Sequence, residues 1–468
     1  MKVAIIGAGY AGLAAAVELA AQGISVTVFE SARQLGGRAR RVDYRGMALD
    51  NGQHILLGVY RETLRLMRMT GADPATLLLR LPLQLVIPGR FSLQAAPLPA
   101  PLHLALALLT ARGLTWGERL SAVRFMSAMR RRNFRIGGHG RDAAPNDETC
   151  HARPPLPNPL PRAGEGANES LREFYINDDI GAGKMLTMHG QTGNLRRYLW
   201  EPLCIAALNT PLDTASAQVF LNVLRDSLAG SRADSDMLLP LANLTHLFPE
   251  HAAAFLESHG GKIIHSQTVL AVKAEAAGFS LEMRPGPEKF DQVICAVPPQ
   301  RLAALTVDLP ELAEARALVD RFSYQPIYSV FLQYPAATSL PRPMIGLYGG
   351  VTQWVFDRGQ INHEAGLLCA VISAEGPHQT LDHDELAQRV HDELLAILPD
   401  LPQPLWHKVI AEKRATFTCS PGLERPGQAT PLPNFYLAGD YTAGDYPATL
   451  ESAVRSGVKC AQLILESP

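Results

Sequence analysis

The sequence predicts an α/β protein in which a Rossmann-like nucleotide-binding domain carries an inserted α+β substrate domain with an antiparallel sheet. Three observations support this fold class. The first apolar run, at residues 2–6, is followed by a glycine-rich turn. Another apolar run, near the other end of the chain, ends at Gly439. The long middle of the chain holds alternating apolar and polar runs, which are typical of antiparallel strands. We therefore expect the two ends of the chain to fold together around one ligand.

The first motif, Gly7-Ala-Gly9-Tyr-Ala-Gly12, joins a strand expected at 2–6 to a helix expected at 11–22. The strand is apolar and β-branched, as in a buried parallel sheet. Gly7 permits the tight turn, Gly9 lets the backbone approach a pyrophosphate, and Gly12 lets the helix pack closely on the strand. The N-terminus of the helix offers free N–H groups to phosphates. This arrangement indicates a dinucleotide site.

A second strand, expected at 25–29, ends at Glu30, where a carboxylate can accept hydrogen bonds from ribose hydroxyls. Adjacent glycines follow at Gly36 and Gly37 and permit another close approach of the backbone. The side chain of Arg38 can neutralise a pyrophosphate. This added turn favours FAD over NAD as the cofactor.

The second motif follows a buried strand expected at 435–438 and ends in Gly439-Asp440. Asp440 can accept a hydrogen bond from a ribityl hydroxyl. A helix is expected to begin in the stretch that starts at Tyr446 and to run to about Leu465. The dipole at its N-terminus would point at the flavin ring. The FAD-binding residues that we predict, for a non-covalently bound cofactor, are Gly7, Gly9, Tyr10, Ala11, Gly12, Glu30, Ser31, Gly36, Gly37, Arg38, Val269, Gly439, Asp440, Thr449 and Leu450.

The predicted FAD-binding domain is discontinuous and consists of residues 1–75, 235–300 and 413–468. The remaining segments, 76–234 and 301–412, are expected to form the substrate-binding domain. The other expected elements are strands at 261–265, 268–275, 280–283, 292–297, 328–334, 345–356, 367–373 and 406–412, and an amphipathic helix at 382–398.

Two segments of the middle region have a biased composition. Residues 137–170 are rich in proline and glycine, which predicts a disordered surface insertion. Residues 98–109 are nearly all proline, alanine and leucine. They fit a buried core helix, the wall of an apolar tunnel or a segment that rests on a bilayer surface.

The composition narrows the class of protein. The net charge is −2, which gives no electrostatic basis for binding nucleic acid. The six cysteines lack the paired spacing of a metal site, and they fit reduced thiols in the cytoplasm. The first strand begins at residue 2 and no apolar run is long enough to span a bilayer, so we expect a cytoplasmic protein, at most peripheral to the inner face of the membrane.

Three segments carry a resemblance to a known family: Leu49–Tyr60, Leu199–Pro211 and Lys413–Phe417. Along nearly its whole length the chain resembles the flavin amine oxidase and carotenoid desaturase superfamily, whose fold is of the glutathione reductase and amine oxidase type. Within it, the chain is most similar to the bacterial hydroxysqualene dehydroxylases of hopanoid biosynthesis. The most specific segment is the Asp50–His54 loop, because superfamily members carry a related turn beside the flavin ring.

The resemblance implies an enzyme that reduces an allylic alcohol, hydroxysqualene, to squalene with hydride from reduced FAD. It implies a polyisoprenoid substrate, an electron donor that the sequence does not identify, and transient contact with a membrane surface and with squalene-pathway enzymes. We expect His54 to be the general acid that protonates the departing hydroxyl, because histidine can hold a proton near neutral pH. Gln53 would hydrogen-bond the flavin or the substrate hydroxyl, and Asp50 is either a third catalytic residue or a turn residue.

Other functions fit the same motifs. A carotenoid or phytoene desaturase would use this fold in the oxidative direction. An amine oxidase would need an aromatic cage, for which Tyr441 and Tyr446 are the available residues. A covalent flavin would require a residue such as Cys419 beside the ring. In the alternative without enzymatic activity, the chain would be an FAD-binding partner of a terpene synthase complex.

Overall fold

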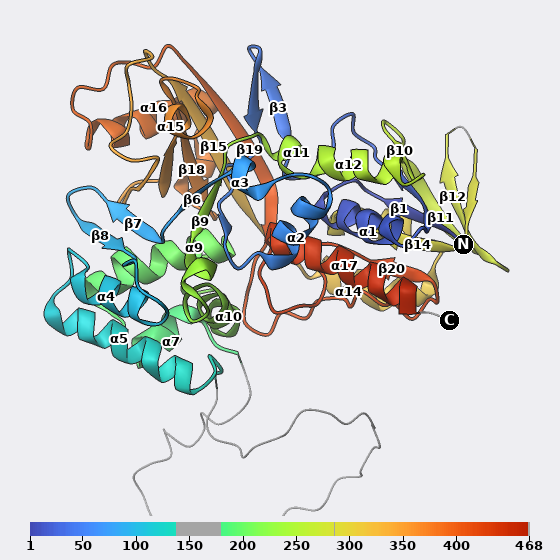
Figure 1. The fold of residues 1–468 in the computed structure, drawn as a ribbon, viewed down its shortest axis with the longest axis horizontal. Coiled ribbons are helices and arrows are strands. Elements are labelled where there is room, and N and C mark those ends of the chain that lie inside the picture. The colour runs from blue at the N-terminus through green and yellow to red at the C-terminus, as the bar shows by residue number, and fades with distance from the viewer. Residues whose placement is uncertain (137–178, 285, 467–468) are drawn as a thin grey trace, which may run out of the picture.

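The computed structural model describes residues 1–136, 179–284 and 286–466 (Figure 1). The insertion predicted at 137–170 lies outside the described residues. Within the described ranges, every helix is too short or too polar to cross a bilayer.

A five-stranded parallel sheet lies next to both termini (Figure 1), and its strands are ordered β10-β2-β1-β14-β20. The strands come from three separate parts of the sequence: β1 (Lys2–Ile6), β2 (Ser25–Phe29), β10 (Lys262–Ile264), β14 (Gln292–Cys295) and β20 (Phe435–Leu437). Parallel strands need crossover connections, so distant segments are joined in one sheet. The two ends of the chain therefore meet in this sheet, as the sequence predicts.

Helix α1 (Tyr10–Ala21) packs between the sheet and α17 (Leu450–Glu466). It is rich in alanine and almost entirely buried. A Cβ atom on Gly457 of α17 would lie 2.0 Å from the carbonyl oxygen of Ala11, so the two helices touch at their backbones. Helix α12 (Pro249–Ser258) contacts α1 as well, and a small antiparallel sheet of β11 (Val269–Glu275), β12 (Gly278–Met283) and β13 (Glu288–Phe290) lies beside β14.

A second five-stranded sheet is antiparallel and is ordered β16-β17-β18-β15-β19. Its strands are β15 (Tyr324–Gln333), β16 (Met344–Gly346), β17 (Trp354–Asp357), β18 (Leu367–Ser373) and β19 (Trp406–Phe417). Helix α16 (His383–Leu395) covers one face through Leu386, Val390 and Leu394. Asp382, with which the helix expected from the sequence begins, caps α16 by accepting hydrogen bonds from the N–H groups of Asp384 and Glu385.

The single strand expected at 345–356 is wrong, because the chain reverses there. It forms the β16–β17 hairpin, in which the N–H of Leu347 donates to the carbonyl of Gln353. Gly349 has a φ of +90°, a conformation that glycine adopts readily, and it permits the reversal. The strand expected at 406–412 is also longer in the structure, since β19 continues to Phe417.

A helical layer lies at the edge of the molecule away from the parallel sheet (Figure 1). Its elements are α4 (Leu102–Thr110), α5 (Trp116–Arg131), α7 (Ala182–Met188), α8 (Gly193–Leu195), the π-helix η1 (Arg196–Trp200), α9 (Glu201–Leu208) and α10 (Ala217–Leu228). The shorter strands are β3 (Arg41–Tyr44), β4 (Met47–Asp50), β5 (Leu56–Leu57), β6 (Leu78–Leu81), β7 (Gln84–Ile87), β8 (Phe91–Gln94) and β9 (Met237–Pro240). The remaining helices are α2 (Arg61–Met69), α3 (Pro74–Leu77), α11 (Leu244–Leu247), α13 (Pro299–Leu305), α14 (Ala313–Asp320) and α15 (Arg358–Asn362), with 3-10 turns at Arg232–Ser235, Pro310–Leu312 and Pro377–Thr380.

Candidate active site

A cavity of about 600 Å³ lies where the parallel sheet, the start of α17 and one face of the antiparallel sheet meet. This volume is in the range of about 300–1,000 Å³ that is usual for ligand and cofactor sites. The glycine-rich turns line one side, and side chains of β15, β17 and β18 line another. Sixteen of the predicted site residues line the cavity: Gly7, Gly9, Tyr10, Ala11, Glu30, Ser31, Gly36, Gly37, Arg38, Gln53, His54, Val269, Gly439, Asp440, Thr449 and Leu450.

The two glycine turns lie against each other and form a floor without side chains. The N–H of Gly36 donates to the carbonyl of Ala8 at 2.9 Å, and a Cβ atom on Gly37 would lie 3.3 Å from the Cα atom of Gly9. Gly12 does not line the cavity, but a Cβ atom there would lie 2.0 Å from the carbonyl oxygen of Gly7. Gly12 therefore serves helix packing, and the other glycines leave room for a ligand backbone such as a pyrophosphate.

The carboxylate of Glu30 is buried and is held by backbone N–H groups. Ala8 and Ala32 each donate to it at 2.8 Å, one to each oxygen. The hydroxyl of Ser31 lies 3.3 Å from one of these oxygens. Because each carboxylate oxygen has further lone pairs, Glu30 can still accept hydrogen bonds from a diol in the cavity. This arrangement fits the ribose of a dinucleotide.

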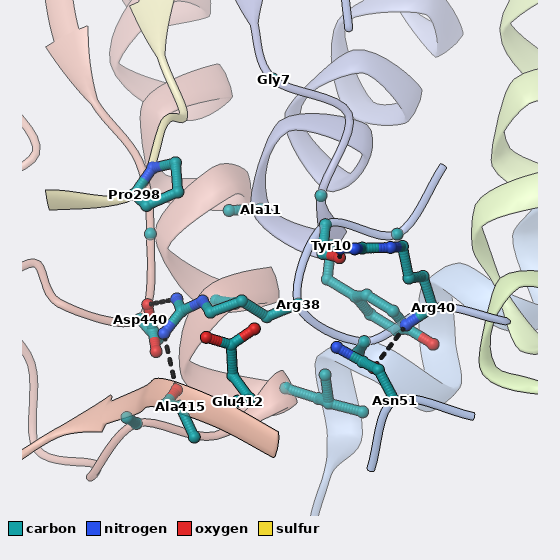
Figure 2. Close-up of a pocket in the computed structure, with 18 of the residues that line it drawn as sticks. Gly7, Tyr10, Ala11, Arg38, Arg40, Asn51, Pro298, Glu412, Ala415 and Asp440 are labelled. Atoms are coloured by element: carbon teal, nitrogen blue, oxygen red, sulfur yellow. Dashed lines mark hydrogen bonds and ion pairs between the residues drawn. The ribbon is translucent and has the colours of Figure 1, made fainter. Parts of the chain in front are cut away.

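The predicted cofactor residues Arg38 and Asp440 bind each other (Figure 2). Nη2 of Arg38 lies 2.5 Å from the carboxylate of Asp440, and Nη1 donates to the carbonyl of Ala415 at 2.8 Å. Glu412 of β19 also lies beside Arg38 and lines the cavity. The sequence assigned Arg38 to the pyrophosphate and Asp440 to the ribityl chain, whereas the structure joins them as a charged pair.

The start of α17 faces the cavity through Thr449 and Leu450. The hydroxyl of Thr449 accepts a hydrogen bond from the N–H of Ser452 at 3.1 Å and caps the helix. Tyr441 also lines the cavity, and its buried hydroxyl has no hydrogen-bond partner among the described residues. Buried hydroxyls are normally satisfied, so this group is available to a ligand.

Of the three predicted catalytic residues, Gln53 and His54 line the cavity and Asp50 does not. Asp50 accepts a hydrogen bond from the N–H of Leu244 at 2.8 Å, and burial raises the pKa of its carboxyl to about 6. Its other oxygen lies 3.5 Å from Nη1 of Arg358. The same Nη1 lies 3.2 Å from the amide oxygen of Gln53, so Arg358 links the carboxylate of Asp50 to Gln53 in the cavity wall.

Arg358 is the residue that holds this group together. Its side chain is 2% exposed, and its Nε pairs with the carboxylate of Glu364 at 2.6 Å. A guanidinium has only donors, so it fixes the amide oxygen of Gln53 towards itself. The amide nitrogen of Gln53 is then left to donate elsewhere.

His54 lines the cavity, and its ring forms no hydrogen bond with another residue that the structure describes, so it is not a histidine held by the backbone. Burial, helped by the charge of Arg38, lowers the pKa of its imidazole to about 4. The ring is therefore neutral near pH 7, which changes the role expected from the sequence. It can donate a hydrogen bond from one ring nitrogen but does not carry a second proton.

Sequence reasoning missed several residues that line or support the cavity. Trp354 and Phe356 alternate along β17 and face the cavity, and the ring nitrogen of Trp354 has no partner among the described residues. The alternating pattern was visible, but not the direction in which it faces. Arg358 and Glu412 had no recognisable signal, because each reaches the site from a distant segment.

Two residues that the alternative functions would use lie outside the cavity. Tyr446 does not line the cavity, because its hydroxyl binds Asp226 and its ring lies under Arg455, so it forms no aromatic cage with Tyr441. Cys419 is buried outside the cavity, and burial raises the pKa of its thiol to about 12. A thiol with so high a pKa is poorly suited to forming a covalent bond to flavin.

Known proteins are similar to the chain over almost its whole length. A model of the family described as flavin containing amine oxidoreductase matches residues 10–465. Hydroxysqualene dehydroxylase from Rhodopseudomonas palustris is 30% identical, over 99% of this chain and 98% of the relative. Zeta-carotene desaturase from Solanum lycopersicum is 25% identical, over 99% and 81%. The solved structure of an oxidoreductase from Methanosarcina mazei shares the fold, with a TM-score of 0.70, 14% identity and 100% of both chains covered. The protein therefore belongs to the flavin containing amine oxidoreductase family and is a flavin-dependent oxidoreductase.

Proposed function

We propose that the protein binds FAD without a covalent bond and reduces hydroxysqualene, an allylic alcohol of squalene and hopanoid biosynthesis, to squalene. The observation that carries this proposal is the two-sided cavity. A glycine floor and the Glu30 carboxylate suit a dinucleotide, and the opposite sheet face is apolar and carries Trp354 and Phe356. The 30% identity with a hydroxysqualene dehydroxylase supports the same substrate class.

The residues present fit FAD at both ends of the cofactor. The pyrophosphate would lie on Gly9 and Gly37, and the ribose hydroxyls would bind Glu30. The start of α17 would place its partial positive charge next to the flavin ring. Reduced FAD would supply a hydride to the substrate carbon.

The remaining chemistry is the loss of the hydroxyl group. The reaction consumes the alcohol, one hydride and one proton, and it yields the hydrocarbon and water. The hydride would come from reduced FAD, and the departing hydroxide would take its proton from solvent. Hydroxide is a poor leaving group, so hydrogen bonds to its oxygen must strengthen as the carbon–oxygen bond breaks. We assign this task to the amide nitrogen of Gln53, which Arg358 orients, and to the ring N–H of neutral His54.

The substrate side of the cavity has a largely apolar wall. Ile327 of β15, Val371 of β18 and Ala207 of α9 line it together with Trp354 and Phe356. An apolar wall suits a polyisoprenoid chain and strengthens the hydrogen bonds made by Gln53 and His54.

The test is an anaerobic single-turnover reaction with purified protein, chemically reduced FAD and hydroxysqualene in detergent. We expect squalene, measured by mass spectrometry, to form as the absorbance band of oxidised flavin returns, one molecule per flavin. Oxidised enzyme with squalene or a carotenoid precursor is the matched control for the desaturase function. Desaturated product in the control, with no squalene in the test, would overturn the proposal. Bound flavin that reacts in neither direction would favour a non-enzymatic FAD-binding partner of a terpene synthase complex.

A further inference from the structure

The outer face of helices α4 and α5 exposes large apolar side chains. Leu102 and Leu106 of α4 are 55% and 41% exposed, and Trp116 and Leu120 of α5 are 67% and 43% exposed. Each pair is spaced by four residues, so its members lie one helical turn apart on the same side of their helix. The two helices lie together at an outer edge of the molecule, away from the parallel sheet (Figure 1).

Arg119 joins the two helices into one unit. Its Nη1 donates to the carbonyl of Leu109 at 3.0 Å, and its Nε donates to the carbonyl of Leu114 at 3.2 Å. Its guanidinium lies 4.8 Å from the centre of the Trp116 ring. The ring is therefore held at the junction of α4 and α5 and stays exposed to solvent. This exposure is unfavourable, because most of the surface of an indole ring is apolar.

The same part of the chain is strongly basic. Between residues 102 and 136 the sequence contains seven arginines, and Glu118 is its single acidic residue. The carboxylate of Glu118 is engaged at the start of α5, where it forms a capping box with Thr115. Arg124 and Arg131 lie on the exposed side of α5 and follow Leu120 along the helix. The whole chain carries a net charge of −2, so this positive charge is local.

An apolar interior lies behind this face. Leu104 and Leu108 of α4 and Met126 of α5 line a small, purely apolar pocket together with Leu203 of α9. Ala207 follows Leu203 by one turn of α9 and lines the active-site cavity. Helix α9 therefore connects the interior of the α4–α5 unit with the catalytic cavity.

We propose that the α4–α5 face docks on the surface of a bilayer that contains anionic lipids, and that the apolar substrate enters between this face and α9. Exposed tryptophan and leucine suit the region between headgroups and acyl chains, and arginines complement anionic headgroups. The docking surface stands on its own observations, whereas the entry of substrate rests on the proposed function.

The test is flotation of the full FAD-loaded chain with vesicles of phosphatidylcholine alone and with phosphatidylglycerol added. We expect binding to the anionic vesicles to be about tenfold tighter or more, and to weaken with added salt. The double variant Trp116→Ser/Leu120→Gln should lose about tenfold in affinity, and Arg124→Glu should lose affinity for the anionic vesicles alone.

Matched control variants change exposed residues elsewhere. Val307 and Leu405 are 66% and 67% exposed, and Val307→Ser/Leu405→Ser should bind as the wild type does. Lys459→Glu on α17 is the charge control. The flavin spectrum of each variant reports folding, and quenching of wild-type tryptophan by brominated lipid measures insertion without any substitution.

Equal loss in the control variants, or no binding by the wild type, would overturn the proposal. The proposal would also be overturned if this face bound a protein of the pathway in the absence of vesicles. If vesicles bind but no squalene forms from hydroxysqualene, the proposed function fails and the docking surface stands. If squalene forms in detergent but the variants bind vesicles as the wild type does, the docking surface fails alone.

Discussion

At the scale of single residues, the environment of His54 decides what it can do. Folding partly buries its ring in the wall of the cavity, where no described side chain forms a hydrogen bond with it. This partial burial disfavours the charged form and lowers the pKa of the ring to about 4. The sequence identified His54 as a candidate, and we expected an ordinary histidine pKa for it. The lower pKa could not be expected, because burial and the nearby charge of Arg38 arise only in the fold. Its contribution to catalysis is therefore expected from the neutral ring.

We predict that the imidazole of His54 titrates below about pH 5 in the folded protein, well under its unperturbed pKa of about 6.5. Because the folded pKa is lowered, the neutral ring favours folding above the unfolded pKa, and this contribution is lost as the pH falls towards 4. Histidine NMR signals compared between wild type and His54→Gln measure the pKa. A His54 signal with a midpoint near 6.5 would contradict the assignment. The free energy of unfolding should fall more steeply with acid in the wild type than in His54→Gln.

The second prediction concerns Arg358 as a positioning residue for Gln53. Gln53→Ala removes the amide that we assign to the substrate hydroxyl, and it should lower kcat by roughly tenfold to a thousandfold with a smaller change in KM. Arg358→Lys keeps the charge but loses the planar fork, so it should lower kcat in the same direction. The loss in the double variant should be less than the product of the two single losses, because both changes disturb one interaction.

Arg389→Lys is the control, since Arg389 is 54% exposed and pairs with Glu393 on the surface of α16. It should leave kcat and KM unchanged. Fully multiplicative losses for Gln53→Ala and Arg358→Lys would show that Arg358 does not act through Gln53. Flavin content and circular dichroism separate this result from simple unfolding. Unfolding is a risk because a weaker cation at position 358 leaves the buried carboxylate of Asp50 and the partly buried carboxylate of Glu364 less well paired.

At the scale of elements, local patterns predicted much of the structure. The strand, glycine turn, helix and second strand at the N-terminus occur where the motif places them, since each is specified by neighbouring residues. The β16–β17 hairpin was missed because its turn at Gly349 interrupts a run whose two halves are both apolar. Arg358, Trp354 and Glu412 could not be assigned to the site, because only the pairing of β18 with β17 and β15, and of β15 with β19, brings their segments to the cavity.

The glycines of the two turns give a prediction at this scale. Gly37 and Gly23 both have left-handed backbones, with φ of +61° and +74°. A side chain at Gly37 would meet the Cα atom of Gly9, whereas a Cβ atom at Gly23 has no neighbour within 4 Å. Gly37→Ala should therefore weaken FAD binding by about tenfold or more, which corresponds to about 1.4 kcal/mol.

Gly23→Ala is the matched control for backbone strain. It should cost about 1–2 kcal/mol of stability and leave FAD affinity unchanged. Gly12→Ala should reduce the amount of folded protein, because its Cβ would lie 2.0 Å from the carbonyl oxygen of Gly7. Titration of the apoprotein with FAD, followed by flavin fluorescence, measures the affinities. Equal affinity for Gly37→Ala and Gly23→Ala would mean that the floor at Gly37 does not contact the cofactor.

At the scale of the whole molecule, the ends of the chain meet in one sheet, and the cavity draws on both of them. The early glycine motif, Glu30 and Val269 line the end of the cavity suited to the nucleotide half of FAD. Thr449 and Leu450, near the other end of the sequence, line the part suited to the flavin ring. A ligand that spans both regions should therefore stabilise the whole fold, and one that occupies a single region should stabilise it less.

FAD and FMN distinguish these cases, because FMN contains the flavin ring and one phosphate but lacks the adenosine half. We predict that FAD at about a hundredfold excess over its Kd raises the free energy of unfolding by about 2.7 kcal/mol. FMN at the same concentration should raise it by far less, since Glu30 would have no ribose to bind. Glu30→Ala should narrow the difference between FAD and FMN, and Glu424→Ala, at an exposed carboxylate, should leave it unchanged. Chemical denaturation of the apoprotein with each flavin measures these differences. Equal stabilisation by FAD and FMN in the wild type would show that the glycine floor and Glu30 do not bind the nucleotide half, and it would remove the structural basis for FAD as the cofactor.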